Sequence, residues 1–584
     1  MTEAAASRKN GVVYTPEILS DYVAAKTLQY FRADQEYRPN VRVSVVDPAC
    51  GDGKLLSSVS KLFPVKDGNR RVTVCGVDID DKAIKSCEKN LAFLGKTVEL
   101  ILVRANALNP TTARSLSLLD ADSRGHGWNP IFAKASVKEG FDILIANPPW
   151  GADISEYQED LDANQYRSLR GQFDSFELFV ELALRIVRPG GYFSFIIPDS
   201  ILNHGKSAIR NLLVSSTEIK FIARLGEKIF PKVNRGCVVI ICKNAPALKA
   251  SLVDCFRLPS KERTMILSGK LSFSQAETIH AHQVPQKRFA GNRQKQFDID
   301  VRESETALLD KFRSGSGTLA DALSCTRGVE LGSSGEIMRC SKCSTWAPLS
   351  ERDSFTCPNC GNKYNPQTAQ KERMTTEKRV SGSVPFVTGS DLKRYSSVAS
   401  KWIILGKKGI NYKRISIYDP PKILIRKTGV GLTASLDYTS ALTNQVVYIL
   451  RKKNDSEPDL EFFIGLINSR AYYFFLVKSF GELEWKSHPY LIQSQILGLP
   501  LPDLSSERNK KIIAKIVSLL RPALKKGRPS QQVDLEAELL IGQLFSFTPE
   551  DYTIMFNAIN ELDELLPVRE LKGIELREVL ERMK

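Results

Sequence analysis

The sequence has few histidines and no long apolar segment. It holds only five histidines in 584 residues, and no histidine–cysteine or serine–histidine pairing indicates nucleophilic catalysis. A run of about eighteen uncharged apolar residues, the minimum for a membrane span, is also absent. Residues 1–10 lack the apolar core of a signal peptide. These absences argue against a membrane protein and lead us to expect a cytoplasmic one.

Cysteine usage does not suit a secreted protein. Eleven cysteines, an odd number, do not indicate a disulfide framework in a chain of this length, so most are expected to be reduced thiols. The length itself exceeds what one hydrophobic core usually organises, and two or three domains are expected.

Positive charge is in excess but is not evenly spread. The formal net charge is +16 and the pI is about 9.2, which favours a polyanionic partner. Eight Lys or Arg lie between Lys401 and Val430 against the single acid Asp419, whereas Gln531 to Pro567 holds eight acids and no Lys or Arg. A basic surface is therefore expected in the second half, although a solvated face is the usual origin of such a run.

The first motif is a strand, turn and helix. A valine-rich strand, Val41 to Val46, runs into Asp-Pro-Ala-Cys-Gly-Asp-Gly at 47–53, and Lys54 to Leu62 has helical character. Glycines in this turn permit close approach of a ligand, and the helix amino terminus favours an anion. The spacing matches neither a dinucleotide fingerprint nor a phosphate-binding loop. A smaller, carboxylate-bearing nucleoside fits better.

Three further strand ends carry polar residues. A strand at Val72 to Val77 precedes Asp78, whose position suits hydrogen bonds from ribose hydroxyls, and Thr97 to Val103 precedes a loop containing Asn106. A buried strand, Phe141 to Ala146, ends in Asn-Pro-Pro-Trp at 147–150. Two prolines make this loop stiff. A Pro-Pro turn with a packing aromatic is the structural alternative.

These motifs, with Thr15-Pro16 before a helix, resemble in their order the gamma-class (Taq-type) DNA adenine-N6 methyltransferases of restriction-modification systems. Phe173 to Phe179, Arg188 to Tyr192 and Leu225 to Pro231 continue the resemblance, which covers about residues 11–243. It implies an α/β fold with a Rossmann-like seven-stranded methyltransferase sheet in residues 1–245. An α+β DNA-recognition domain would follow at 246–509, and a helical segment at 510–584.

The resemblance also implies site residues. One departure concerns Asn106, where the family commonly has Asp; the amide oxygen can still accept from the adenine amine of the cofactor. S-adenosyl-L-methionine would be held by Tyr14, Thr15, Asp47, Ala49, Cys50, Gly51, Asp78, Ile79, Asn106, Ala107 and Asn147. The catalytic residues would be Asn147, Pro148, Pro149, Trp150 and Phe230.

The catalytic loop has a physical rationale of its own. An exocyclic amine of a nucleobase is a poor nucleophile, and two rigid acceptors, the Asn147 oxygen and the Pro148 carbonyl, would localise its lone pair. Trp150 offers a stacking face for a flipped base, which Phe230 would close on the other side. Plain structural roles are the alternatives: Phe230 in the core, Asp47 capping a turn. Cys50 is expected to be a small apolar neighbour, His204 a surface histidine, and Thr15 the N-cap of the first helix.

Four cysteines in the second half are spaced as zinc ligands. Cys340 and Cys343, then Cys357 and Cys360, form two Cys-x-x-Cys pairs thirteen residues apart, which suits a tetrahedral structural Zn²⁺ in a ribbon at about 336–365. An iron–sulfur site is the less favoured alternative.

Flanking segments complete the expected organisation. Ala245 to Asp300 is interpreted as a linker, and Val384 to Tyr395, Pro421 to Lys427 and Phe462 to Arg470 resemble the target-recognition region. Aromatic and basic residues alternate from Trp402 to Arg414, as a surface for phosphates and base edges would require. Residues 510–584 are expected to be helical packing elements, with a role in partner binding as the alternative.

The predicted function is methylation of adenine N6 in double-stranded DNA. Cytosine-N4 methylation is closest in chemistry, although Asn147 favours adenine; RNA adenine and protein glutamine are further possible substrates. A DNA-specificity module with an inactive cofactor fold is the alternative from another class. Because the motifs begin near residue 11, a cognate endonuclease is expected on a separate chain, if one exists.

Overall fold

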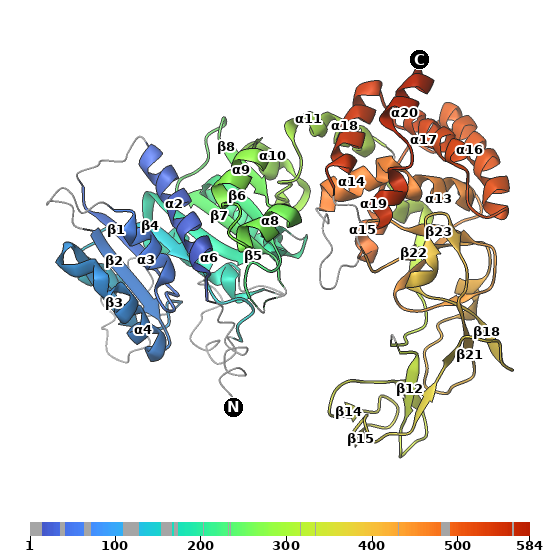
Figure 1. Ribbon diagram of the computed structural model, residues 1–584, viewed down its shortest axis with the longest axis horizontal. Helices are drawn as coiled ribbons and strands as arrows, with labels where there is room; N and C mark the ends of the chain where they lie inside the picture. The colour runs from blue at the N-terminus through green and yellow to red at the C-terminus, as the bar shows by residue number, and fades with distance from the viewer. Residues whose placement is uncertain are drawn as a thin grey trace. The chain divides into compact units, whose positions relative to one another are not determined.

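The protein is described from a computed structural model (Figure 1), which shows two compact units, Met1–Arg302 and Glu303–Lys584. No single helix among the described residues is long and apolar enough to cross a membrane. The pair α13 (Leu460–Asn468) and α14 (Arg470–Phe480) passes that test jointly, but it bends by 60° and is largely buried. The described residues are 14–34, 41–63, 72–108, 128–153, 166–168, 173–202, 204–231, 233, 235–315, 317–332, 334–429, 431–480, 491–562 and 566–584.

The first unit is built on one mostly parallel sheet, whose strand order within the described ranges is β3-β2-β1-β4-β5-β7-β6-β8-β9. The strands β1 to β4 confirm the four predicted ones, and β6 and β7 pair in antiparallel orientation. The strands are β1 (Val43–Asp47), β2 (Val72–Asp78), β3 (Val98–Arg104), β4 (Phe141–Ala146), β5 (Val187–Pro198), β6 (Glu218–Gly226), β7 (Cys237–Lys243), β8 (Leu252–Arg257) and β9 (His282–Pro285).

Helices cover both faces of this sheet, so the central strands are buried on both sides. One apolar cluster joins α5, α6 and α7 to the sheet, and a second, on the other face, joins α2, α3, α4, α8 and α9. The helices of the unit are α2 (Glu17–Ala33), α3 (Lys54–Lys61), α4 (Asp81–Leu91), α5 (Asn129–Ala135), α6 (Ser175–Ile186), α7 (Ser207–Ser216), α8 (Ser260–Leu267), α9 (Phe273–His280) and α10 (Gln286–Gly291).

The expected linker is part of the fold. Residues 245–300 contain β8, which pairs in parallel with β6, and β9, which closes the edge of the sheet. Val253, Cys255 and Phe256 of β8 are fully buried, so their short apolar run is core and not a connection. The expected sheet of seven strands is therefore extended by two, and the compact unit ends at Arg302 and not at 245.

The second unit combines small sheets with a helical bundle. Figure 1 shows the bundle at one end of this unit and β12, β14 and β15 at the other. Strand orders in its described residues include β11-β25-β22-β23, β17-β21-β18-β24 and β13-β12-β16. These strands are β11 (Leu323–Arg327), β12 (Glu336–Arg339), β13 (Trp346–Pro348), β14 (Phe355–Thr356), β15 (Lys363–Tyr364), β16 (Lys371–Arg373), β17 (Thr375–Thr376), β18 (Ser383–Val387), β21 (Lys401–Ile404), β22 (Lys422–Arg426), β23 (Ala434–Asp437), β24 (Leu442–Thr443) and β25 (Val447–Lys452).

The helices include those expected for residues 510–584, which pack into the second unit and form no separate compact unit of their own. Some carboxylates of the acidic stretch 531–567 are buried between these helices and the rest of the second unit. Asp534 and Glu538 are buried and bind the guanidinium groups of Arg394 and Arg470. Besides α13 and α14, the helices are α11 (Glu303–Arg313), α12 (Leu319–Ala322), α15 (Gln493–Leu497), α16 (Glu507–Lys525), α17 (Gln531–Leu544), α18 (Pro549–Asn560), α19 (Leu566–Leu571) and α20 (Leu576–Met583).

Candidate cofactor pocket and catalytic loop

The turn after β1 is held by the acid that ends β2. Asp78 accepts hydrogen bonds from the backbone N–H of Gly51 at 2.9 Å and of Asp80 at 2.9 Å, and Asp47 accepts from Ala49 N–H at 3.0 Å. Asp47 therefore does cap its own turn. Gly53 adopts φ +80°, and a Cβ there would lie 2.6 Å from the sulfur of Cys87. Only glycine fits this position.

This turn forms one wall of a cavity of about 220 Å³ at the carboxyl ends of β1, β2, β3 and β4. The cavity brings together all the predicted cofactor residues and Pro149, whereas Pro148, Trp150 and Phe230 do not line it. The predicted residues that line it are Tyr14, Thr15, Asp47, Ala49, Cys50, Gly51, Asp78, Ile79, Asn106, Ala107 and Asn147.

Carboxylates dominate the electrostatics of the cavity. Burial, with repulsion from Asp78 and Asp52, raises the pKa of Asp47 to about 8. Burial also raises the pKa of Asp78, against the opposing effect of its backbone hydrogen bonds. Asp80 and Asp153 bring the carboxyls of the lining to five, against the single cation Lys54. This excess of acids suits a ligand that carries positive charge.

Asn147 directly follows β4 and contacts Thr15, which precedes α2. Its Nδ2 donates to Thr15 Oγ1 at 3.1 Å. Thr15 was expected to cap α2, but it makes no capping bond; Pro16 occupies the N-cap position. The hydroxyl instead accepts from the amide nitrogen of Asn147, which ties the residue before α2 to the loop after β4.

The rest of the loop is pinned by the residues that open α6. Ser175 Oγ donates to the carbonyl of Pro149 at 2.6 Å and accepts from Ala152 N–H at 3.1 Å. Asp174 accepts from Gly151 N–H at 2.6 Å. Two adjacent side chains therefore hold the three residues 149, 151 and 152, which lets the loop keep one conformation.

The aromatic residues are packed against each other. The rings of Trp150 and Phe230 meet edge to face, with centroids 5.1 Å apart and planes at 82°. Both are buried, and Trp150 Nε1 donates to the carbonyl of Ile196 at 3.3 Å. The expected slot for a base between them is closed in this structure, because the two apolar rings bury one another.

Arg235 joins the loop of Phe230 to the catalytic loop. Its Nη2 lies 3.0 Å from Asp174 Oδ2, and its Nη1 lies 3.5 Å from where a Cβ of Gly151 would be. No sequence motif pointed to Arg235, since its partner is sixty-one residues away. Phe179 was missed as well, although it lines the cavity one helical turn after Ser175. The aromatic stretch 173–179 was the available signal.

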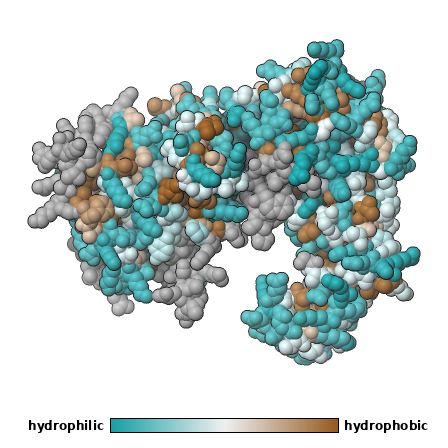
Figure 2. All heavy atoms as spheres, in the orientation of Figure 1, coloured by the Kyte–Doolittle hydropathy of each residue, from teal (hydrophilic) through white to brown (hydrophobic). Residues whose placement is uncertain are grey.

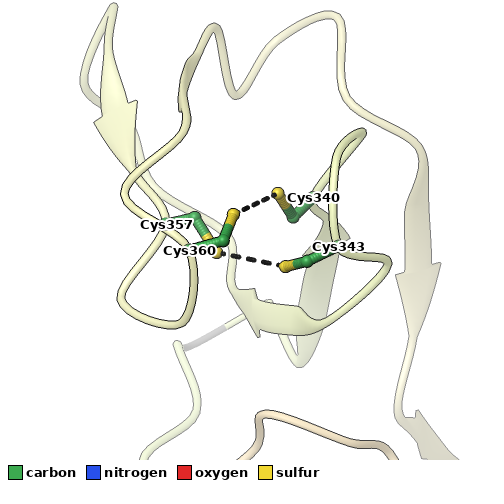
Figure 3. A group of neighbouring side chains, drawn as sticks. All are labelled: Cys340, Cys343, Cys357 and Cys360. Carbon is green, nitrogen blue, oxygen red and sulfur yellow. Dashed lines mark hydrogen bonds between the residues drawn. The ribbon is translucent and has the colours of Figure 1, made fainter.

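The four predicted zinc ligands converge in the second unit. The sulfurs of Cys340, Cys343, Cys357 and Cys360 all lie within 4.8 Å of one another (Figure 3). The separations are 3.7 Å for Cys340–Cys360 and 3.6 Å for Cys343–Cys357. A tetrahedral zinc with Zn–S bonds of about 2.3 Å separates its sulfurs by about 3.8 Å. The donor set and its spacing therefore fit such an ion.

Part of the expected basic surface is buried. Lys422 is fully inaccessible, 2.7 Å from Asp437 Oδ2, and it also donates to the carbonyl of Thr439 at 2.5 Å. Burial lowers its pKa. Lys422 therefore forms a buried ion pair between β22 and β23 and is not part of a surface that could contact phosphates.

Comparisons with known proteins agree with this geometry. Residues 73–230 match the Eco57I restriction-modification methylase family, and residues 384–501 match the TaqI-like C-terminal specificity domain. The type II methyltransferase M.BanIII of Aneurinibacillus aneurinilyticus is 27% identical over 232 residues, 38% of this chain and 37% of that protein. M.VspI of Vibrio sp. (strain 343) is 23% identical over 213 residues, 35% and 43% of the two chains.

The chain thus spans less than half the length of these two relatives. A solved structure of the type IIL restriction-modification enzyme MmeI in complex with DNA shares the fold across both units, with 11% identity and a TM-score of 0.50. That likeness covers 96% of this chain and 75% of the other. The chain therefore contains a restriction-modification methylase domain of the Eco57I type, matched over residues 73–230, and a TaqI-like C-terminal specificity domain, matched over residues 384–501.

Proposed function

We propose that the protein is an S-adenosylmethionine-dependent DNA methyltransferase that acts on N6 of adenine in duplex DNA. The observation that carries this proposal is the position of Asn147, whose amide is hydrogen-bonded to Thr15 at the wall of an acid-lined cavity. An enzyme of this kind would act on intracellular DNA.

The cavity suits S-adenosylmethionine better than an anionic nucleotide. When bound, this cofactor supplies an electrophilic methyl group on a sulfonium and carries an ammonium group of the same sign. The carboxyls of Asp47, Asp78 and Asp80 favour both charges, and Asp78 also stands at the tip of β2, where ribose hydroxyls are recognised. The tight turn at Gly51 and Gly53 leaves room for the amino-acid portion.

The catalytic loop would act on the target amine through hydrogen bonds. The Asn147 side-chain oxygen and the Pro148 carbonyl would accept the two amino hydrogens and localise the nitrogen lone pair. Because Ser175 and Asp174 already fix the loop, the acceptors would need no reorganisation during the reaction. The Trp150–Phe230 pair would have to open for a flipped base to enter between the rings.

Replacement of Asn147 tests this assignment. Asn147→Ala should lower kcat at least about a hundredfold, because one of two preorganised acceptors is removed, while duplex binding is retained. Asn557→Ala, at an exposed position of α18, is the matched control. Transfer of labelled methyl groups to genomic DNA is the measurement. Undiminished transfer by Asn147→Ala would contradict the assignment.

The identity of the methylated base is tested separately. Digestion of the product to nucleosides, followed by mass spectrometry, should show N6-methyladenine. N4-methylcytosine would replace the adenine proposal with the alternative of similar chemistry. Duplex binding without transfer to either base would indicate a specificity module with an inactive cofactor fold.

We further propose that the four cysteines hold a structural zinc ion, since four thiolates leave no open coordination position. Metal analysis of the purified protein should find about one zinc per chain, and Cys357→Ser should lose it together with the fold of residues 336–365. Absence of zinc from the purified chain would reject this site.

A further inference from the structure

The part of the second unit that contains the proposed zinc ribbon has a positive net charge, unlike the rest of the unit. We call residues 334–414 the ribbon lobe. The lobe holds fifteen Lys and Arg against six Asp and Glu, a net charge of +9, whereas the rest of Glu303–Lys584 holds twenty-five against twenty-seven. More than half of the lobe precedes residue 384, where the match to the specificity domain begins. Eight of the fifteen Lys and Arg precede residue 384, and these eight are the cations that the family match does not cover.

Most of these cations face solvent without a carboxylate partner. In the lobe, every residue of which is described, the ion-paired cations are Lys407 with Glu372, Lys413 with Glu330 and the buried Arg394 with Asp534. Figure 2 shows predominantly hydrophilic residues at the end of the unit that contains β12, β14 and β15. The exposed, unpaired cations are Arg339, Lys342, Arg352, Lys363, Lys371, Arg373, Lys378, Arg379, Lys393, Lys408 and Arg414.

The two cations and the one acid of β16 lie on opposite faces of this strand. Side chains alternate along a strand, so Lys371 and Arg373 point to one side and Glu372 to the other. Glu372 is used inward, in its ion pair with Lys407, whose ammonium also lies 5.1 Å from the ring centre of Trp346. Lys371 and Arg373 therefore lie on the other face of this edge strand, both exposed, with Glu336 of β12 across from Arg373.

We propose that the ribbon lobe, through its Lys and Arg that precede residue 384, binds the phosphate backbone of duplex DNA outside the bases that the specificity domain reads. The proposal deepens the proposed function and rests on it. Flexible lysines and arginines on a small metal-stabilised module suit phosphates, which need charge but little shape complementarity. The lobe would therefore add affinity without adding sequence preference.

The salt dependence of binding tests this proposal. A variant with Lys342, Lys363, Lys371 and Arg373 all changed to Gln is compared with wild type by fluorescence anisotropy. The probes are two duplexes of about 30 base pairs, one with the mapped methylation site and one scrambled. The slope of log affinity against log salt should shrink by about 0.9 for each phosphate that the variant no longer neutralises, up to about 3.6 in all. Affinity should fall by the same factor on both duplexes.

A charge-matched variant controls for net charge. Lys511, Lys515, Lys525 and Lys526 are exposed on or directly after α16, in the part of the unit that is not positive, and changing them to Gln should leave the slope within about one unit of wild type. Zinc content of one ion per chain in both variants shows that the ribbon is folded.

Three results would overturn the proposal: an unchanged slope in the lobe variant, an equal reduction in the control, or a weakening confined to the duplex with the site. Tighter binding of an RNA hairpin than of duplex DNA would also overturn it and assign the lobe to RNA. In each case methyl transfer by the wild type would survive. If the wild type neither binds nor methylates DNA, the proposed function fails as well, and the two failures are thereby distinguished.

Discussion

Asp47 is a buried carboxyl whose surroundings disfavour its charged form. Its folded pKa of about 8 lies above the value of about 3.9 expected in an unfolded chain. Asp47 therefore contributes fully to the free energy of unfolding at a pH below about 4, where it is protonated in both states, and this contribution is lost as pH rises through the folded pKa. Stability of the empty protein should decline between about pH 4 and pH 8, and Asp47→Asn should flatten this decline.

A cationic ligand reverses the preference of this carboxyl. If a sulfonium and an ammonium lie beside Asp47, they favour its ionised form, so binding should release a proton. We predict that S-adenosylmethionine binds more tightly as pH rises from about 6 to 8.5, and that Asp47→Asn removes this trend. Calorimetric titration in buffers of different ionisation enthalpy measures the released proton. An equal pH dependence in wild type and variant would contradict the prediction.

Under the proposed function, Arg235 would act on the reaction only through Asp174, as a positioning residue. Arg235→Ala should lower kcat by about ten- to a hundredfold, since the catalytic loop loses one of its ties, and should change KM for S-adenosylmethionine much less. Arg235→Lys should recover part of the rate. Arg188→Ala breaks an Arg–Asp pair of similar exposure at the opposite end of β4 and should leave kcat within about twofold of wild type. Equal losses in Arg235→Ala and Arg188→Ala would indicate a general structural effect.

At the scale of elements, the helix α17 is tied to the specificity domain by buried charge. Arg394 donates to both oxygens of Asp534, at 2.8 and 2.6 Å, and to the carbonyl of Asn468. Arg470 shares Asp534 and also reaches Glu538. Although burial opposes its charge, the pKa of Asp534 is lowered by Arg394 and Arg470.

Removal of one carboxylate from this network leaves guanidinium groups buried without compensation. Asp534→Ala should destabilise the second unit by about 3–5 kcal/mol. Arg577→Ala removes an exposed ion pair with Glu581 and should cost less than about 0.5 kcal/mol. Denaturant unfolding, with zinc release as the readout of the second unit, measures both. A cost below about 1 kcal/mol for Asp534→Ala would show that the buried pairs are replaceable.

Elements differ in how far the sequence predicts them. The turns after β1, β2 and β4 were predictable because each is a local pattern of glycine, acid or proline after a buried strand, and the same holds for the paired cysteines. Strand β8 was not, because its apolar run is short and its burial depends on pairing with β6. Lys422 was misplaced for a related reason: its partner Asp437 is brought beside it only by the β22–β23 pairing. Long-range pairs, such as Arg235 with Asp174, leave no local signal.

The whole molecule consists of two units that bind different ligands under the proposals above. Differential scanning calorimetry should therefore resolve two transitions. S-adenosylmethionine at about a hundred times its Kd should stabilise the first unit by about 2.7 kcal/mol. A zinc chelator should lower only the second transition. A single transition shifted by both reagents would show that the units unfold as one.

The buried network around Asp534 also defines what can be exchanged between related proteins. The match to the specificity domain spans residues 384–501 and includes Arg394 and Arg470, but their carboxylate partners lie beyond it, on α17. A chimaera that replaced only residues 384–501 would keep Asp534 and Glu538 of the host protein but would lose Arg394 and Arg470, to which these carboxylates bind. A segment exchanged to alter target choice should therefore extend to Leu544, the end of α17. Chimaeras that include α17 should express as folded protein, whereas chimaeras that end at residue 501 should aggregate.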